Sequence, residues 1–269
     1  MIITDTHLHS SISSDSQTPM KDMVEAAISC GLTDIYFTEH MDYEFPKSHA
    51  LPFVFDPDEY FRKTDECKQM YGSKINIHSG IELGLKDNLK KDYTELLADY
   101  PWDYVIGSTH LVDDLDPYYD EYWENRNVYE AIKEYFVKTY NNINAFCNFD
   151  SLGHLDYILR YARSEFDKEY VYKDCADLID SILKFIIEKD IALEINTSGY
   201  RSKLKTPNPD IQLIRCYIEL GGEKITIGSD AHSPENIAIK YDQLEKLLRD
   251  NGITQYYSYV NRKPIIHNL

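Results

Sequence analysis

Basic residues are scarce in this chain of 269 residues. Lysine and arginine together number 28, against 46 aspartates and glutamates, so the formal net charge is −18 at pH 7. A surface that binds nucleic acid needs a positive footprint, so we expect no nucleic-acid partner. The acidic balance is typical of a soluble cytoplasmic protein, and acid gathered in a pocket would also suit a cationic substrate.

The sequence also lacks the signatures of membrane proteins, secreted proteins and several common enzyme classes. No apolar run approaches the ~20 residues that span a membrane, and no basic leader precedes the first apolar run, so we expect neither an anchor nor a signal peptide. The five cysteines form no CxxC pair, which favours small buried side chains in a reducing compartment. The GxSxG, P-loop and GxGxxG motifs are absent, so serine hydrolases, P-loop NTPases and dinucleotide-binding enzymes have no support.

What the chain does contain is a short apolar run that recurs seven times and closes on residue types that bind metals. The runs lie at 2–9, 35–40, 77–82, 105–110, 152–156, 193–196 and 225–232. Helical periodicity fills the intervening stretches of roughly 25 to 40 residues, which is the spacing of βα units. We therefore expect a single α/β domain over 1–269, with a site where the C-terminal ends of parallel barrel strands meet.

Capping side chains followed by proline mark helix starts at Thr18-Pro19, Asp56-Pro57 and Ser233-Pro234. Periodicity predicts further helices over 127–146, 173–189 and 209–220. The irregular segments 41–55, 112–126 and 198–209 follow strand ends, so they are expected to form the rim of the site. His49, in the first of these segments, is placed to reach a substrate, and the tail over 256–269 is expected to add a strand-like arm.

The strand ends carry the candidate chemistry. His7 and His9 alternate along a strand, so both can face one metal, and Asp5 on the same face is expected to orient a ligand. Asp230 and His232 repeat this alternation in the seventh run. Glu82 can bridge two cations, and three more strand-end histidines are His40, His110 and His154.

A single histidine at a strand end is more often structural than a metal ligand. Six of the nine histidines lie at these ends, however, together with Glu82 and Asp230. Burying so many titratable groups without metals would cost on the order of several kcal/mol each, so a metal site is the better interpretation.

Two arginines follow strand ends in a chain that is poor in positive charge. Arg160 comes after the fifth run and Arg201 after the sixth. A guanidinium group matches the geometry of phosphate and neutralises it. Either residue alone would be read as a surface arginine, but their place on the rim favours contact with a phosphate.

Taken in order, the motifs DxHxH, TEH, GxE, STH, GHxD and SDAH resemble the PHP family, which is named for polymerases and histidinol phosphatases. The resemblance runs from Asp5 to His232. With the GHLDY segment at 153–157 and no polymerase region, the chain is most similar to the monofunctional histidinol-phosphate phosphatase branch. This resemblance implies a distorted (β/α)7 TIM-like barrel with the metal site at the C-terminal ends of the strands, in agreement with the seven runs.

The resemblance also implies three divalent metal ions, with Zn, Mn and Fe as the candidates. It assigns the first to His7, His9, Glu82 and Asp230, the second to Glu82, His110 and His154, and the third to Asp15, His40 and His232. Many relatives carry histidine where this chain has Asp15. The aspartate shifts the preference of that site toward harder metals such as Mn²⁺ or Fe²⁺.

The implied activity is metal-dependent hydrolysis of a phosphomonoester, above all L-histidinol phosphate in histidine biosynthesis. Glu82 and Asp230 would hold cations that lower the pKa of bound water and so supply a nucleophile. Arg160 and Arg201 would bind the phosphate and stabilise its charge. Two further acids, Glu39 and Asp42, are candidates for holding the ammonium or imidazole of the substrate, or for supporting a metal ligand.

Three alternatives stay open. A phosphoesterase of the same fold for a nucleotide or sugar phosphate would carry the same metal motifs. A non-catalytic metal-binding module is disfavoured by the intact set of ligands. A proofreading module associated with a polymerase is disfavoured by the net charge and by the absence of an appended domain.

Overall fold

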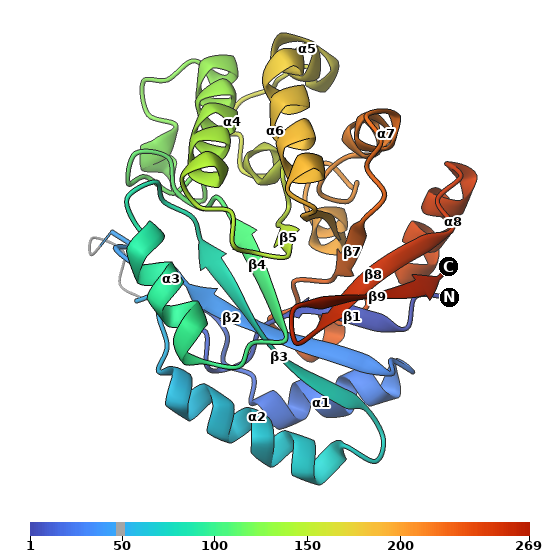
Figure 1. Ribbon diagram of the computed structural model, residues 1–269. Helices are drawn as coiled ribbons and strands as arrows, with labels where there is room; N and C mark the ends of the chain where they lie inside the picture. The colour runs from blue at the N-terminus through green and yellow to red at the C-terminus, as the bar shows by residue number, and fades with distance from the viewer. Residues whose placement is uncertain (47–51) are drawn as a thin grey trace.

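The computed structural model describes residues 1–46 and 52–269, and its centre is a barrel of seven parallel strands (Figure 1). The strands are β1 (Thr4–Leu8), β2 (Asp34–Met41), β3 (Asn76–Gly84), β4 (Tyr104–Ser108), β5 (Ser151–Leu152), β6 (Ala192–Asn196) and β7 (Ile225–Gly228). Their order in the sheet is their order in the chain, as expected of successive βα crossovers of one hand. The prediction of a (β/α)7 barrel is confirmed, while His49 lies outside the described residues.

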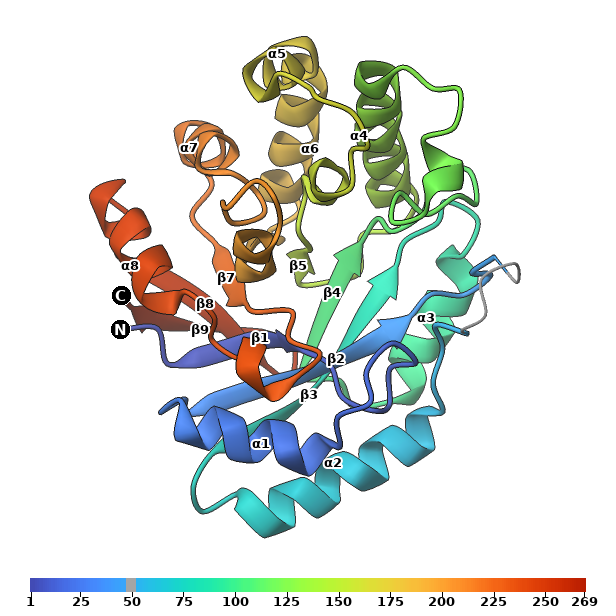
Figure 2. The same ribbon diagram turned by 180° about the vertical axis from the view of Figure 1, so that it is seen from behind.

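Helices cover the outside of the barrel (Figures 1 and 2). They are α1 (Met20–Ser29), α2 (Pro57–Tyr71), α3 (Lys90–Asp99), α4 (Val128–Ala145), α5 (Lys168–Asp174), α6 (Ala176–Glu188), α7 (Ile211–Glu219) and α8 (Tyr241–Asp250). The predicted caps of α2 and α4 are confirmed, since the side chain of Asp56 accepts the N–H of Asp58 and that of Asn127 accepts the N–H of Tyr129. These caps satisfy amides that the first helical turn leaves unpaired.

Two predicted helices differ from the structure. The helix expected over 173–189 is two helices that meet at Cys175. Ser233-Pro234 opens a short 3-10 turn rather than a helix, and α8 begins at Tyr241 instead. The reason is a tertiary contact, because the carboxylate of Asp5 accepts the backbone N–H of Ala238 at 3.2 Å and holds this segment against the barrel.

The barrel closes between β1 and the end of β7, where the candidate ligands lie. The N–H of Asp230 donates to the carbonyl of His7 at 2.8 Å, and the N–H of His9 donates to the carbonyl of Ala231 at 2.9 Å. Nearer the N-terminal ends of the two strands, the hydroxyl of Thr6 donates to the carbonyl of Ile227 at 3.0 Å. Barrel closure therefore sets the DxHxH and SDAH motifs side by side.

The C-terminal tail closes the opposite end of the barrel. Strands β8 (Gln255–Val260) and β9 (Lys263–Asn268) form an antiparallel hairpin. Its buried side chains pack against residues of β2, β4 and β6 in a cluster made of Tyr36, Tyr104, Ile106, Ala192, Tyr257 and Tyr259. Arg262, in the turn of the hairpin, donates to Asp150 at 2.5 Å, just before β5. The arm expected from the sequence thus acts as a plug at the N-terminal ends of the strands.

Two further expectations concern the cysteines and the membrane. All five cysteines are free, and Cys67 and Cys175 are buried as expected, whereas Cys30 is exposed. Across residues 1–46 and 52–269, no helix combines the length and the apolar character that crossing a bilayer requires.

The plug predicts a difference between two residues of the same hairpin. Tyr259→Ala removes a ring that is 3% exposed and is expected to lower the free energy of unfolding by about 3 kcal/mol, as other losses of a buried aromatic ring do. Ile266→Ala, at a position 59% exposed, is the control and should change it by no more than about 0.5 kcal/mol. Denaturant unfolding measures the free energy of both variants. A loss in Tyr259→Ala as small as the one expected of the control would show that the tyrosine cluster does not stabilise the barrel.

Candidate metal centre at the mouth of the barrel

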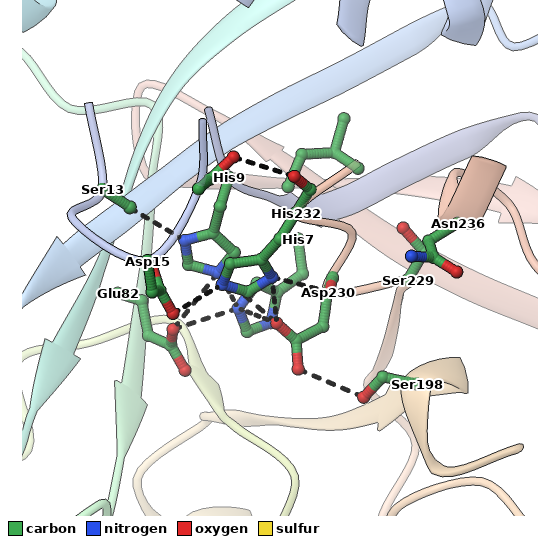
Figure 3. Close-up of polar contacts among 12 residues, drawn as sticks. His7, His9, Ser13, Asp15, Glu82, Ser198, Ser229, Asp230, His232 and Asn236 are labelled. Carbon is green, nitrogen blue, oxygen red and sulfur yellow. Dashed lines mark hydrogen bonds and ion pairs between the residues drawn. The ribbon is translucent and has the colours of Figure 1, made fainter. Parts of the chain in front are cut away.

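All nine side chains expected to hold metal lie together at the C-terminal ends of the strands. Groups of three with ligand atoms within 4.8 Å of one another are His9, His40 and His232; His7, His9 and Asp230; His40, Asp42 and His110; and Glu82, His110 and His154. Asp15 joins the first of these groups, because its Oδ2 lies 3.0 Å from His232 Nε2. Figure 3 shows six of these side chains pointing toward a common centre from loops and strands far apart in the sequence, namely His7, His9, Asp15, Glu82, Asp230 and His232.

Glu82 is at the middle of this arrangement. Its Oε2 lies 3.1 Å from His7 Nε2 and 3.0 Å from His40 Nδ1. Its Oε1 lies 2.9 Å from His154 Nε2 and 3.2 Å from His110 Nε2. Burial alone would raise the pKa of this carboxyl, but the neighbouring imidazoles, led by His7, hold that pKa well below its usual range. A carboxylate that faces four imidazoles has the geometry to bridge two cations.

The ligand atoms fit metal ions better than they fit one another. The Nε2 atoms of His7 and His9 approach to 3.1 Å, although two unprotonated nitrogens cannot hydrogen-bond. Within the candidate ligands, four buried atoms form no hydrogen bond to any described residue, namely Glu82 Oε2, His40 Nδ1, His154 Nδ1 and His232 Nε2. Buried polar atoms are rarely left unpaired. Imidazole and carboxylate are the ligands that zinc, iron and manganese favour, so the residues fit these ions.

Glu194 fixes the ring of His7 from behind. Its Oε1 lies 2.5 Å from His7 Nδ1, so Nδ1–H donates and Nε2 faces the centre. The other oxygen of Glu194 accepts the backbone N–H of His154 at 2.8 Å. The sequence placed Glu194 at a strand end without a role and expected Asp5 to orient a ligand. In the structure the Asp5 carboxylate contacts backbone rather than an imidazole, since it accepts the N–H of Ser229 at 2.8 Å and that of His7 at 3.4 Å.

Glu39 acts on His9 through Ser13. Its carboxylate is fully buried and accepts the hydroxyls of Ser10 at 2.5 Å and Ser13 at 2.6 Å. Because the Ser13 hydroxyl gives its proton to Glu39, its oxygen accepts from His9 Nδ1 at 3.1 Å, which leaves His9 Nε2 facing the centre. Burial raises the pKa of Glu39. The side chain reaches the loop after β1 instead of the cavity, so the expected contact with substrate gives way to a supporting role.

Asp42 holds His110 in the same way and also lines the cavity. Its Oδ1 lies 2.8 Å from His110 Nδ1, which turns Nε2 of that ring toward Glu82. Gly84, at the end of β3, makes room for this carboxylate, because a Cβ there would lie 1.4 Å from Asp42 Oδ1. Three of the histidines are therefore each oriented by an acidic residue, directly or through one hydroxyl.

A cavity of about 460 Å³ opens above the candidate ligands. Both arginines line it, with Arg160 NH1 3.6 Å from Asp230 Oδ2 and Arg201 NH2 donating to the Asp230 carbonyl at 3.1 Å. The segment 112–126 contributes to the rim as expected and brings residues that the sequence did not single out, among them Asp116 and Tyr118. Their signal was the high content of aspartate and tyrosine in this loop.

Comparisons with known proteins agree with this geometry. The PHP domain model matches residues 5–198. A probable histidinol-phosphatase of Clostridium acetobutylicum is 33% identical over 246 residues, which cover 91% of this chain and 92% of the relative. The histidinol-phosphatase of Lactococcus lactis subsp. lactis is 30% identical and covers 96% and 95% of the two chains.

A solved structure extends the comparison to three dimensions. The crystal structure of histidinol phosphate phosphatase from Lactococcus lactis, complexed with zinc, L-histidinol and phosphate, has a TM-score of 0.89 to this chain at 28% identity. The similarity covers 97% of this chain and 98% of that one. Because the domain model spans most of the barrel and these relatives extend over nearly the whole length, the chain belongs to the PHP family, in its histidinol-phosphatase branch.

Proposed function

We propose that this chain is a cytoplasmic, metal-dependent histidinol-phosphatase that hydrolyses L-histidinol phosphate to L-histidinol and phosphate. One observation carries the proposal: convergent imidazoles and carboxylates and two arginines line the same cavity of about 460 Å³. The Lactococcus lactis structure, which holds zinc, L-histidinol and phosphate, supports the same substrate here.

We assign three divalent ions to this site. His7, His9 and Asp230 hold the first with Glu82, which also holds the second with His110 and His154, and the third lies among Asp15, His40 and His232. Compact groups of ligand atoms support the first two sets directly, and the position of Asp15 beside His40 and His232 supports the third. Divalent cations in such a site lower the pKa of water and neutralise phosphate oxygens.

The arginines supply the remaining positive charge. Arg160 and Arg201 flank Asp230 from one wall of the cavity, so a phosphate near Asp230 lies within reach of both guanidinium groups. Planar guanidinium donors match the oxygens of a phosphoryl group and stabilise charge that develops on them during transfer. We assign both residues to phosphate binding and catalysis.

The lining of the cavity also suits the organic end of histidinol phosphate. Aromatic rings of Phe53, Tyr157 and Tyr161 line it together with the carboxylates of Asp42 and Asp116. Acidic groups and ring faces attract cations, and the ammonium and imidazole of histidinol provide them. A sugar phosphate or nucleotide brings no comparable cation, so this lining favours the amino-alcohol substrate.

The proposed activity is tested by phosphate release. Metal-loaded protein, prepared with Mn²⁺, Zn²⁺ or Fe²⁺, should show a kcat/KM for L-histidinol phosphate about 100-fold above that for a sugar phosphate or nucleoside monophosphate, because only the first substrate pairs with the acidic and aromatic lining of the cavity. Elemental analysis should find more than one ion per chain, and Glu82→Ala should lose the two ions assigned to Glu82 together with turnover. Equal rates on all substrates would indicate a general phosphoesterase, and a loaded but inactive protein would indicate a metal-binding module.

Removing the support of His7 should weaken metal binding. Glu194→Gln deletes the charge that fixes the His7 tautomer, so affinity for the ion at His7 is expected to fall roughly 10- to 100-fold. Titration against a coloured chelator measures this. Glu188→Gln, on the exposed end of α6, is the matched control and should bind metal like the parent protein. Parent-like affinity in Glu194→Gln would remove Glu194 from the metal site.

The arginines should affect catalysis without affecting metal content. Arg201→Ala is expected to raise the free-energy barrier in kcat/KM by roughly 2 to 4 kcal/mol, the scale for one charge-stabilising donor. Arg201→Lys should recover part of the loss, since a point charge does not reproduce a planar fork. Arg215→Ala, exposed on α7, is the control and should leave the steady-state kinetics unchanged. Unchanged kinetics in Arg201→Ala with full metal content would place the phosphate on the metals alone.

A further inference from the structure

Asp156 ends the GHLD segment, yet neither the metal ligands nor the cavity account for it. The residue is 1% exposed. Its carboxylate accepts three hydrogen bonds, from Asn208 Nδ2 at 2.5 Å, from the backbone N–H of Asp210 at 2.9 Å and from the hydroxyl of Tyr172 at 3.0 Å. All three partners donate a hydrogen bond to Asp156. This fits an ionised carboxylate, because a carboxylate has no proton to donate and only accepts hydrogen bonds.

Asn208 connects this carboxylate to Arg160. Its Oδ1 accepts from Arg160 Nε at 2.6 Å, while its Nδ2 donates to Asp156. The two neighbours fix the orientation of the amide, because the guanidinium only donates and the carboxylate only accepts. The backbone of Asn208 is fixed as well, since it exchanges hydrogen bonds of 2.7 and 2.9 Å with Asn196 at the end of β6.

The loop at 206–208 packs closely against the end of β6, and this packing depends on Gly199. A Cβ at position 199 would lie 2.3 Å from the carbonyl oxygen of Thr206 and 2.6 Å from Asn208 Oδ1. A side chain there would displace the loop that presents Asn208. The absence of a side chain at Gly199 therefore lets the loop at 206–208 lie against the NTSG segment at the end of β6. This position brings the amide of Asn208 to Arg160.

Only part of the Arg160 guanidinium is left to face a ligand. Its Nε is bound by Asn208, and its NH2 donates to the hydroxyl of Ser198 and, at 3.3 Å, to Asn196 Oδ1. NH1 is the nitrogen that lies beside Asp230, at the wall of the cavity. The protein therefore hydrogen-bonds the Nε and NH2 edge of the guanidinium and leaves NH1 facing the cavity.

We propose that Asp156 and Asn208 are positioning residues that act through Arg160. The buried carboxylate fixes the amide, and the amide fixes the guanidinium, so that NH1 is held where the phosphate binds. A donor ordered before the reaction stabilises the transition state more than one that must be ordered during it. The inference rests on the proposed function, in which Arg160 contacts the phosphate.

A double-mutant cycle tests this connection in the metal-loaded full-length protein. Arg160→Ala is expected to lower kcat/KM for L-histidinol phosphate about 100-fold, and Asn208→Ala about tenfold with unchanged metal content. If Asn208 acts through Arg160, the double variant should lie within about twofold of Arg160→Ala alone, because the amide has nothing left to position. Independent effects would instead multiply to about 1,000-fold.

Asp150 provides a matched control for Asp156. Both aspartates are buried and flank the short strand β5, but Asp150 lies at the plugged end, where it accepts from Arg262 Nε and from the N–H of Val105. Asp156→Asn should lower kcat/KM and lose this effect in the Arg160→Ala background. Asp150→Asn should lower stability and leave kcat unchanged. If Asn208→Ala does not fold, the double-mutant cycle of Asp156→Asn with Arg160→Ala still tests whether this network acts through Arg160.

Calorimetric binding of inorganic phosphate separates this inference from the proposed function. Asn208→Ala and Arg160→Ala should both weaken phosphate binding to the metal-loaded protein, again without adding to each other. Parent-like kinetics and phosphate affinity in Asn208→Ala and Asp156→Asn, or losses that multiply with that of Arg160→Ala, would overturn the positioning role. A parent protein that binds phosphate but does not hydrolyse L-histidinol phosphate would overturn the proposed function, and the phosphate-binding cycle would still decide the role of Asn208.

Discussion

Glu82 is 1% exposed and lies within 3.2 Å of four imidazole nitrogens. A carboxylate so deep in a protein needs positive charge nearby, and the histidines can supply it either as imidazolium groups or as ligands that share cations with it. Each histidine must then turn the correct nitrogen inward. The supporting residues follow from this requirement, because Glu194, Asp42 and the pair Ser13–Glu39 each bind the Nδ1 of one ring.

The two ends of the barrel differ in role: the N-terminal end is packed, and the C-terminal end carries the candidate site. At the N-terminal ends of the strands, the hairpin packs its tyrosines into the interior and leaves an aromatic cluster where other barrels carry aliphatic layers. At the C-terminal ends, the strands stop at different heights, and β5 has two residues. This irregularity brings side chains from strands and from the loops after them to one point, so the distortion of the barrel is part of how the site is assembled.

The sequence predicted the barrel and the set of converging residues well, because both depend on local patterns. Alternation in DxHxH placed His7 and His9 on one face, and the parallel register pairs His40 with Glu82 on neighbouring strands. The same rule argues against Glu39 as a residue of the cavity, since neighbours on a strand point to opposite faces and His40 already faces the centre.

What the sequence could not supply are contacts between segments that are distant along the chain. Glu194 meets His7 across 187 residues, and Asn208 meets Arg160 across 48. No periodicity marks such pairs, because they depend on how loops fold over the strand ends. The start of α8 was also missed for this reason, since a hydrogen bond from Ala238 to Asp5, 233 residues away, outweighs the local signal of Ser233-Pro234.

The hairpin plug has a consequence for access to the site. With the bottom of the barrel filled by packed rings, the cavity has its opening at the rim, where Tyr118 and Asp116 lie. Anything that enters or leaves the cavity would therefore have to pass this one opening, between the loops that follow the strands.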